Sequence, residues 1–152
     1  MQTNNFLAYA EKSLDYGVMG ILILMSIVTL WLFIERMMFY SSIKVETYKY
    51  RDELDIDLTN NIGVLSAIGT NAPYVGLLGT VLGIMITFYT LGDVGEVDAK
   101  KIMMGLALAL KATAMGLVVA MPAIVFYTIA LRKVEKILAK FDIHQSKVNK
   151  NG

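Results

Sequence analysis

The stretch GLLGTVLGIMITFYTLGD, residues 76–93, is uncharged up to its final aspartate. Its first sixteen residues include three glycines and three threonines: Gly76, Gly79, Gly83, Thr80, Thr87 and Thr90. Glycine is a poor helix former, and a threonine hydroxyl in apolar surroundings needs a hydrogen-bond partner. The combination therefore points to contacts that acyl chains do not provide.

Three windows of the sequence contain almost no charge: residues 17–34, 74–91 and 102–131, the last with the single lysine Lys111. Hydrophobic residues make up 56% of the chain and charged residues only 18%, which argues against a soluble domain. About twenty apolar residues span a bilayer as a helix, so each window can cross with help from its flanks. We therefore predict an all-α integral membrane protein with three transmembrane helices per chain.

The positions of lysine and arginine predict the orientation of these helices. Ten of these residues lie between the first two windows or in the C-terminal tail, against three in the N-terminal segment and after the second window. Basic residues concentrate in the parts of a membrane protein that stay in the cytoplasm. We expect a multi-pass membrane protein with its N-terminus on the outer side and its C-terminus in the cytoplasm.

The chain is expected to divide into seven segments. They are an outer-side amphipathic helix (1–16), the first span (17–36), a cytoplasmic loop with helical character (37–69), the second span (70–91), a periplasmic loop (92–99), the third span (100–131) and a basic cytoplasmic tail (132–152). Asn71 is expected to cap the second span, with Pro73 in its first turn, and Pro122 to bend the third. The tail is expected to be helical to about Phe141 and frayed beyond it. Since the first span runs directly into WLFIERMMFY, we interpret it as a retained helix and not as a cleaved signal peptide.

Small side chains form a stripe along one face of each of the last two spans. Close packing drives membrane helices together, and small residues permit it, so the simplest interpretation is that the stripes are packing faces. The packing candidates are Pro73, Gly76, Gly79, Gly83, Gly105, Ala109, Gly116 and Pro122.

The threonines suggest a second use for the same faces. If the last two spans form an antiparallel hairpin, Thr80 and Thr113 lie at similar depth inside the apolar zone. A single threonine hydroxyl can bond a carbonyl of its own helix and have no functional role. Two threonines at the same depth can instead line a channel that holds water or a partner. The two spans contain no Asp, Glu or His, so a titrating group for protons would have to come from another subunit.

Lys111 is the one charge inside a span, where lysine is costly and often functional. Two interpretations remain open: the side chain extends to the membrane surface or forms a structural ion pair, or it contacts a pore or partner. His144, the only histidine, is expected to be solvent-exposed in the tail. With no cysteine and no catalytic, phosphate-binding or metal-ligand motif, we expect no enzyme activity, cofactor, metal or nucleic-acid partner.

The segments APYVGLLGTVLGIM (72–85) and LKATAMGLVVAMPAIVFY (110–127) closely resemble the ExbB/TolQ/MotA family of ion-driven motor stators. The Glu35-Arg36 pair that ends the first span, and the order of one span, a loop, a hairpin and a tail, fit the same family. The resemblance covers roughly residues 15–140, and the brief loop between the first two spans makes the chain most similar to a short form of the ExbB branch.

The resemblance implies a ring in the bacterial inner membrane, with periplasmic N-termini. The ring is expected to be a homopentamer embedded in membrane lipids, whose second and third spans line a central pore. The pore would hold helices of an ExbD-like single-span subunit with a membrane aspartate, and the complex would use the proton gradient to drive a TonB-like protein in transport across the envelope. Thr80 and Thr113 match the family's pore threonines. The family thus supplies the carboxylate that the two spans lack.

The sequence departs from the family in one position. Relatives commonly have a glutamate five residues before the second threonine, whereas this chain has Leu108 with Lys111 nearby. Our hypothesis is that Lys111 compensates electrostatically by holding an anion or a partner carboxylate. Two other functions stay open: a TolQ-like stator of the envelope-constricting Tol system, and a passive membrane scaffold in which the stripes serve assembly alone.

Overall fold

The computed structural model describes residues 2–92 and 99–151, and within them every long element is a helix. The helices are α1 (Gln2–Ser42), α2 (Arg51–Thr59), α3 (Ile62–Gly92) and α4 (Ala99–Asn151), with the short 3-10 turn η1 (Val45–Thr47) between α1 and α2. Three of the described helices, α1, α3 and α4, are long and apolar enough to cross a membrane. This is the all-α, three-span architecture that the sequence predicted.

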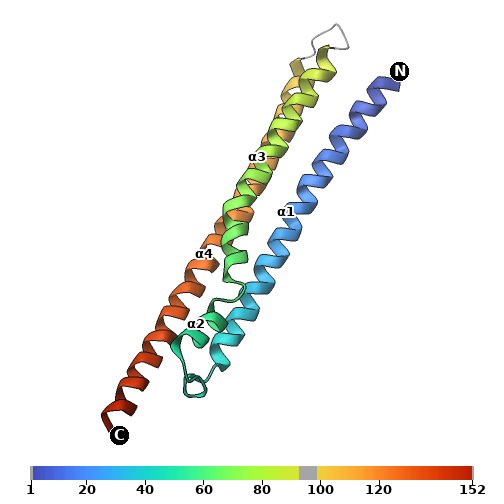
Figure 1. The fold of residues 1–152 in the computed structure, drawn as a ribbon. Coiled ribbons are helices and arrows are strands. Elements are labelled where there is room, and N and C mark those ends of the chain that lie inside the picture. The colour runs from blue at the N-terminus through green and yellow to red at the C-terminus, as the bar shows by residue number, and fades with distance from the viewer. Residues whose placement is uncertain (1, 93–98, 152) are drawn as a thin grey trace.

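The three long helices lie side by side, with the two termini at opposite ends of the bundle (Figure 1). Helices α3 and α4 run antiparallel in close contact, and α1 packs along this hairpin. Its axis diverges from the hairpin toward the N-terminus. The contact between α1 and the hairpin is an apolar cluster of buried residues: Val18, Leu22, Ile68, Ala72, Ala112, Val119, Ala120 and Ala123.

A second apolar cluster forms at the other end of the bundle, where α2 folds back between α1 and α4. Leu54 and Leu58 of α2 are fully buried there, against Tyr40 of α1 and Val134 and Phe141 of α4. Since α2 has only nine residues, it is too short to be stable as an isolated helix, and burial of its leucines holds it in place.

Two side chains of α1 bond the last turn of α2, whose carbonyls have no partner within the helix. The Tyr40 hydroxyl donates to Leu58 O at 2.9 Å, and the Arg36 guanidinium donates to Asp57 O at 3.3 Å. Burial raises the pKa of the Tyr40 phenol to about 12, a rise that the positive charge of Arg36 partly opposes. The α2 end of the bundle is therefore fixed to α1 by hydrogen bonds as well as by apolar contact.

The turn from α2 into α3 takes only two residues. Asn60 ends α2, and Asn61 has a φ of 61°, a left-handed conformation that asparagine adopts more readily than most residues. Helix α3 then begins at Ile62, which is earlier than the expected start of the second span near residue 70. Asn71 is therefore no cap: its side-chain amide donates to Ala67 O at 2.7 Å in the helix interior.

The structure differs from the sequence-based expectation at both ends of the chain. Residues 1–16 do not form a separate helix, because α1 continues unbroken from Gln2 to Ser42. At the other end, α4 extends to Asn151 with no end near Phe141, and it passes through Pro122. The expected loop 92–99 falls largely on residues 93–98, which lie outside the described part of the chain.

Candidate functional site

The closest approach of α3 and α4 occurs where Gly76 faces Gly116. A Cβ atom on Gly76 would lie 2.6 Å from the carbonyl oxygen of Ala112 and 3.2 Å from the Cα of Gly116. A Cβ atom on Gly116 would lie 2.7 Å from the carbonyl oxygen of Ala72. Any side chain at either position would push the two helices apart, so both glycines are required by the contact between backbones.

This contact brings Thr80 and Thr113 together one turn away. Their hydroxyl oxygens lie 2.5 Å apart, so the predicted similar depth of the two residues is confirmed. The Thr80 hydroxyl also lies 3.0 Å from Ala109 O across the helix interface and 3.3 Å from Gly76 O in its own helix. Thr80 is buried, whereas Thr113 is only partly buried.

The hydrogen-bond inventory of this pair leaves free acceptors. A hydroxyl donates one hydrogen bond and can accept two. If Thr80 donates to the Ala109 carbonyl, Thr113 can donate to Thr80, and the lone pairs of the Thr113 oxygen remain unused. Both hydroxyl protons of the pair therefore have acceptors within the chain, and the Thr113 oxygen can still accept a hydrogen bond from a group outside it.

Gly79, Gly83 and Gly105 make packing contacts only, and Thr87 and Thr90 bond their own helix. The Cβ positions of Gly79 and Gly83 would meet the methyl groups of Ala112 and Ala109, and that of Gly105 would meet the Thr87 side chain, with Cγ2 at 2.7 Å. The Thr87 and Thr90 hydroxyls donate to carbonyls four residues back in α3, each at 2.8 Å. Among the described threonines of the hairpin, Thr80 and Thr113 are thus the two that bond across it.

Lys111 meets a residue of α1. Its ammonium nitrogen lies 3.6 Å from a carboxylate oxygen of Asp15, and the two side chains are 48% and 36% exposed. Asp15 is a residue that the sequence analysis did not single out, because it precedes the first uncharged window and lies far from Lys111 in the chain. Only the packing of α1 on α4 shows that the lone charge of the third span has an opposite charge beside it.

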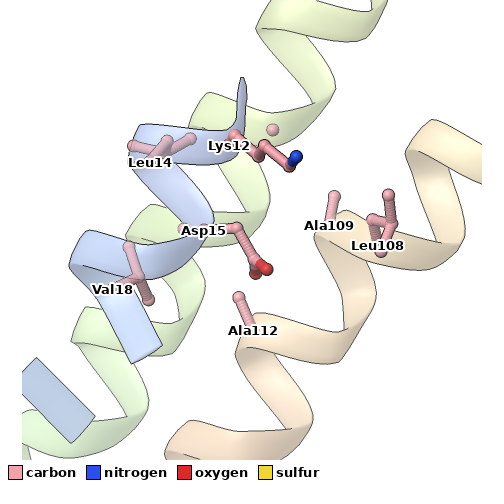
Figure 2. A pocket seen from close by; sticks show the side chains of 9 residues that line it. Lys12, Leu14, Asp15, Val18, Leu108, Ala109 and Ala112 are labelled. Atoms are coloured by element: carbon pink, nitrogen blue, oxygen red, sulfur yellow. The ribbon is translucent and has the colours of Figure 1, made fainter. Parts of the chain in front are cut away.

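A cavity of about 330 Å³ lies next to this ion pair, between α1 and the hairpin. It is lined by Lys12, Leu14, Asp15, Val18, Gly79, Gly83, Leu108, Ala109 and Ala112. Figure 2 shows the Lys12 and Asp15 side chains extending from α1 toward α4. Leu108, the position at which the family resemblance implies a glutamate, therefore shares a cavity with the carboxylate of Asp15.

The hairpin is weakly polar in its apolar part, and its one charge there is Lys111 of α4. Helix α3 carries no residue of the Asp, Glu, His, Lys or Arg types from Ile62 to Gly92. The two spans therefore offer the hydroxyls of Thr80 and Thr113 but no carboxylate or imidazole that could take up a proton.

The comparison with known proteins covers the part of the hairpin that holds the two threonines. Residues 32–143, which include both threonines and all of α3, match the family described as the MotA/TolQ/ExbB proton channel family.

This chain belongs to the MotA/TolQ/ExbB family.

Two relatives in the family show how far the similarity extends. The biopolymer transport protein ExbB of Aquifex aeolicus is 52% identical over 135 residues, which cover 88% of this chain and 91% of that protein. The biopolymer transport protein ExbB of Helicobacter pylori strain J99 is 49% identical over 137 residues, 90% of this chain and 94% of that protein. The predicted membership of this family, in a short ExbB-like form, is therefore confirmed. The chain is an ExbB-type biopolymer transport protein of a proton channel family.

Proposed function

We propose that this chain is the ring-forming subunit of an inner-membrane motor that uses proton flow to energise TonB-dependent uptake through the outer membrane. The observation that carries the proposal is the hydrogen-bonded pair Thr80 and Thr113, held at one depth in two spans that contain no acid. Family membership and the ExbB relatives support the same function. The proposed ring is a homopentamer, with α3 and α4 facing the pore.

The proton carrier in this proposal is an aspartate on the membrane helix of an ExbD-like subunit inside the ring. When that acid is protonated, its O–H can donate to the free lone pairs of the Thr113 oxygen, while Thr113 continues to donate to Thr80. When the acid is ionised, the Thr113 hydroxyl rotates and donates to the carboxylate instead. The threonine pair thus stabilises both protonation states of a partner acid without titrating itself.

The glycines contribute by keeping the hairpin rigid and narrow. Because Gly76 and Gly116 allow backbone contact, α3 and α4 can act as one wall while the enclosed helix moves. In the proposed orientation, the α2 end of the bundle and the tail lie in the cytoplasm, and the end near residues 93–98 faces the periplasm. The TonB-like protein would receive the motion on the periplasmic side.

The test is to express the chain together with its single-span partner, purify the complex and reconstitute it in liposomes with a pH-sensitive dye inside. We expect the intact mass to give a ring with the partner bound, and a proton gradient to acidify the interior. Thr113→Val should preserve the mass of the complex and abolish the proton flux. Thr29→Val is the matched control, since the Thr29 hydroxyl bonds its own helix at Met25 O in α1. A complex without any partner helix, or an unchanged flux in Thr113→Val, would rule out the proposal.

A passive scaffold is the second candidate, and the packing contacts of Gly79, Gly83 and Gly105 favour it. In a scaffold the hydroxyls of Thr80 and Thr113 would serve only the helix interface. Both valine variants should then assemble and support uptake in cells as well as the wild type does. A TolQ-like role would instead appear as co-purification with a Tol-type partner.

A further inference from the structure

The cavity between α1 and the hairpin is a site that the proposed function does not use. Neither Thr80 nor Thr113 lines it. Its walls are apolar or glycine except at one end, where Lys12 and Asp15 extend into it from α1 (Figure 2).

The size of the cavity limits what can occupy it. A helix with its side chains is about 10 Å across, which is too large for a space of about 330 Å³. Away from Lys12 and Asp15, the lining residues Leu14, Val18 and Leu108 offer no hydrogen-bond partner, and apolar space of this kind does not retain water. A single acyl chain has both the size and the polarity of the apolar part.

The charges at the end of the cavity favour an anion above that chain. Asp15 is already paired with Lys111 at 3.6 Å. The Lys12 ammonium has no ion-pair partner among the residues whose side chains the structure describes, so the three groups together leave one positive charge. On α1, Lys12 stands about 7 Å, at helical rise, before the first uncharged window begins, so its long side chain can extend to the level of the lipid phosphates.

We propose that this cavity binds an anionic phospholipid, with its phosphate on the ammonium of Lys12 and one acyl chain beside Leu14, Val18 and Leu108. The Asp15–Lys111 pair forms the wall beside the headgroup, and the small residues of the hairpin leave the space for the chain. The lipid would lie between α1 and the hairpin, on the part of α1 whose axis diverges from the hairpin (Figure 1). The inference does not depend on proton transport, because a scaffold of the same structure would have the same site.

Native mass spectrometry of the full-length chain, stripped of lipid in detergent and then given phosphatidylglycerol or phosphatidylcholine, tests the proposal. We expect phosphatidylglycerol to be retained in preference to phosphatidylcholine, and Lys12→Gln to reduce its retention about fivefold, the effect of one basic side chain at a membrane surface. Lys101→Gln is the matched control, since Lys101 is exposed at the start of α4 and does not line the cavity. Excess inorganic phosphate should not displace the lipid.

Four results would overturn the proposal: no retention of phosphatidylglycerol, equal retention of the two lipids, equal losses in the Lys12 and Lys101 variants, or displacement of the lipid by phosphate alone. The first would also be obtained if a second copy of the chain covered the cavity. Circular dichroism and the oligomer mass of Lys12→Gln should match the wild type, because the lysine is exposed.

Discussion

Gly76 and Gly116 meet with no space for a side chain on either: a Cβ on Gly116 would lie 3.1 Å from the Cα of Gly76. This backbone contact decides the distance between α3 and α4, and therefore the distance between the Thr80 and Thr113 hydroxyls one turn away. The glycines and threonines of the stretch 76–93 thus have separate tasks. The glycines set the distance between the helices, and at that distance the Thr80 hydroxyl bonds across the interface.

Gly76→Ala should destabilise the hairpin by about 1–3 kcal/mol, the usual cost of overpacking a tight contact, because its methyl would lie 2.6 Å from Ala112 O. Unfolding in sodium dodecyl sulfate, followed by circular dichroism, measures the change. Gly20→Ala in α1 is the control: nothing lies within 4 Å of its Cβ position, so it should be neutral or slightly stabilising. Equal behaviour of the two variants would contradict the close contact.

Thr80→Val and Thr113→Val should leave the oligomer intact and reduce TonB-dependent uptake by about tenfold or more, since a hydrogen bond to a charged group contributes about 1.5–3 kcal/mol. Thr113→Ser retains the hydroxyl and should retain most of the uptake. Growth on a substrate that requires an outer-membrane receptor gives the readout. Full activity in both valine variants would mean that the hydroxyls serve packing alone.

The strength of the ion pair between α4 and α1 can be measured with the variants Lys111→Met and Asp15→Asn, alone and combined. Because both side chains are substantially exposed, the coupling free energy in the double-mutant cycle should be below about 1 kcal/mol. The exchange variant, which combines Asp15→Lys with Lys111→Asp, should restore the ion pair and its coupling free energy. If Lys111→Met leaves complex formation and uptake unchanged, the hypothesis that Lys111 compensates for the missing glutamate at Leu108 is wrong.

Tyr40→Phe removes the hydrogen bond to Leu58 O and should lower the free energy of unfolding of the α2 end by about 1 kcal/mol. The pKa of the phenol rises from 10.0 to about 12 on folding, so the folded state holds this proton more tightly than the unfolded state. The resulting stabilisation is complete below pH 10 and is lost as the pH rises toward 12. Thermal unfolding at several pH values above 9 should show a smaller decline in Tyr40→Phe than in the wild type, since Tyr48, whose pKa is raised by its hydrogen bond to Asp57, is common to both.

The sequence was sufficient for the features that follow from one-dimensional patterns. Uncharged windows predicted the three spans, and the arithmetic of an antiparallel hairpin predicted the matched depth of Thr80 and Thr113. Motif resemblance also predicted the family. These features depend on composition or on neighbours in one hairpin.

Features that depend on distant segments were not predicted. Helix α2 exists because Leu54 and Leu58 are buried against α1 and α4, and nothing in its own nine residues shows this. Asparagine is a common helix-capping residue, but Asn71 lies inside α3, which begins at Ile62. The capping preference of this residue type therefore did not decide where the helix starts. Asp15 and Lys111 meet only because α1 packs on the hairpin.

The unbroken run of α4 from Ala99 to Asn151 has a mechanical consequence. At 1.5 Å per residue this helix is about 80 Å long, and Thr113 lies nearer its beginning than its end. Buried contacts, first with α1 and then with α2 as well, hold α4 from Ala112 to Phe141. If a partner helix presses on Thr113, as we propose, this continuous helix would pass the displacement on to the α2 end of the bundle.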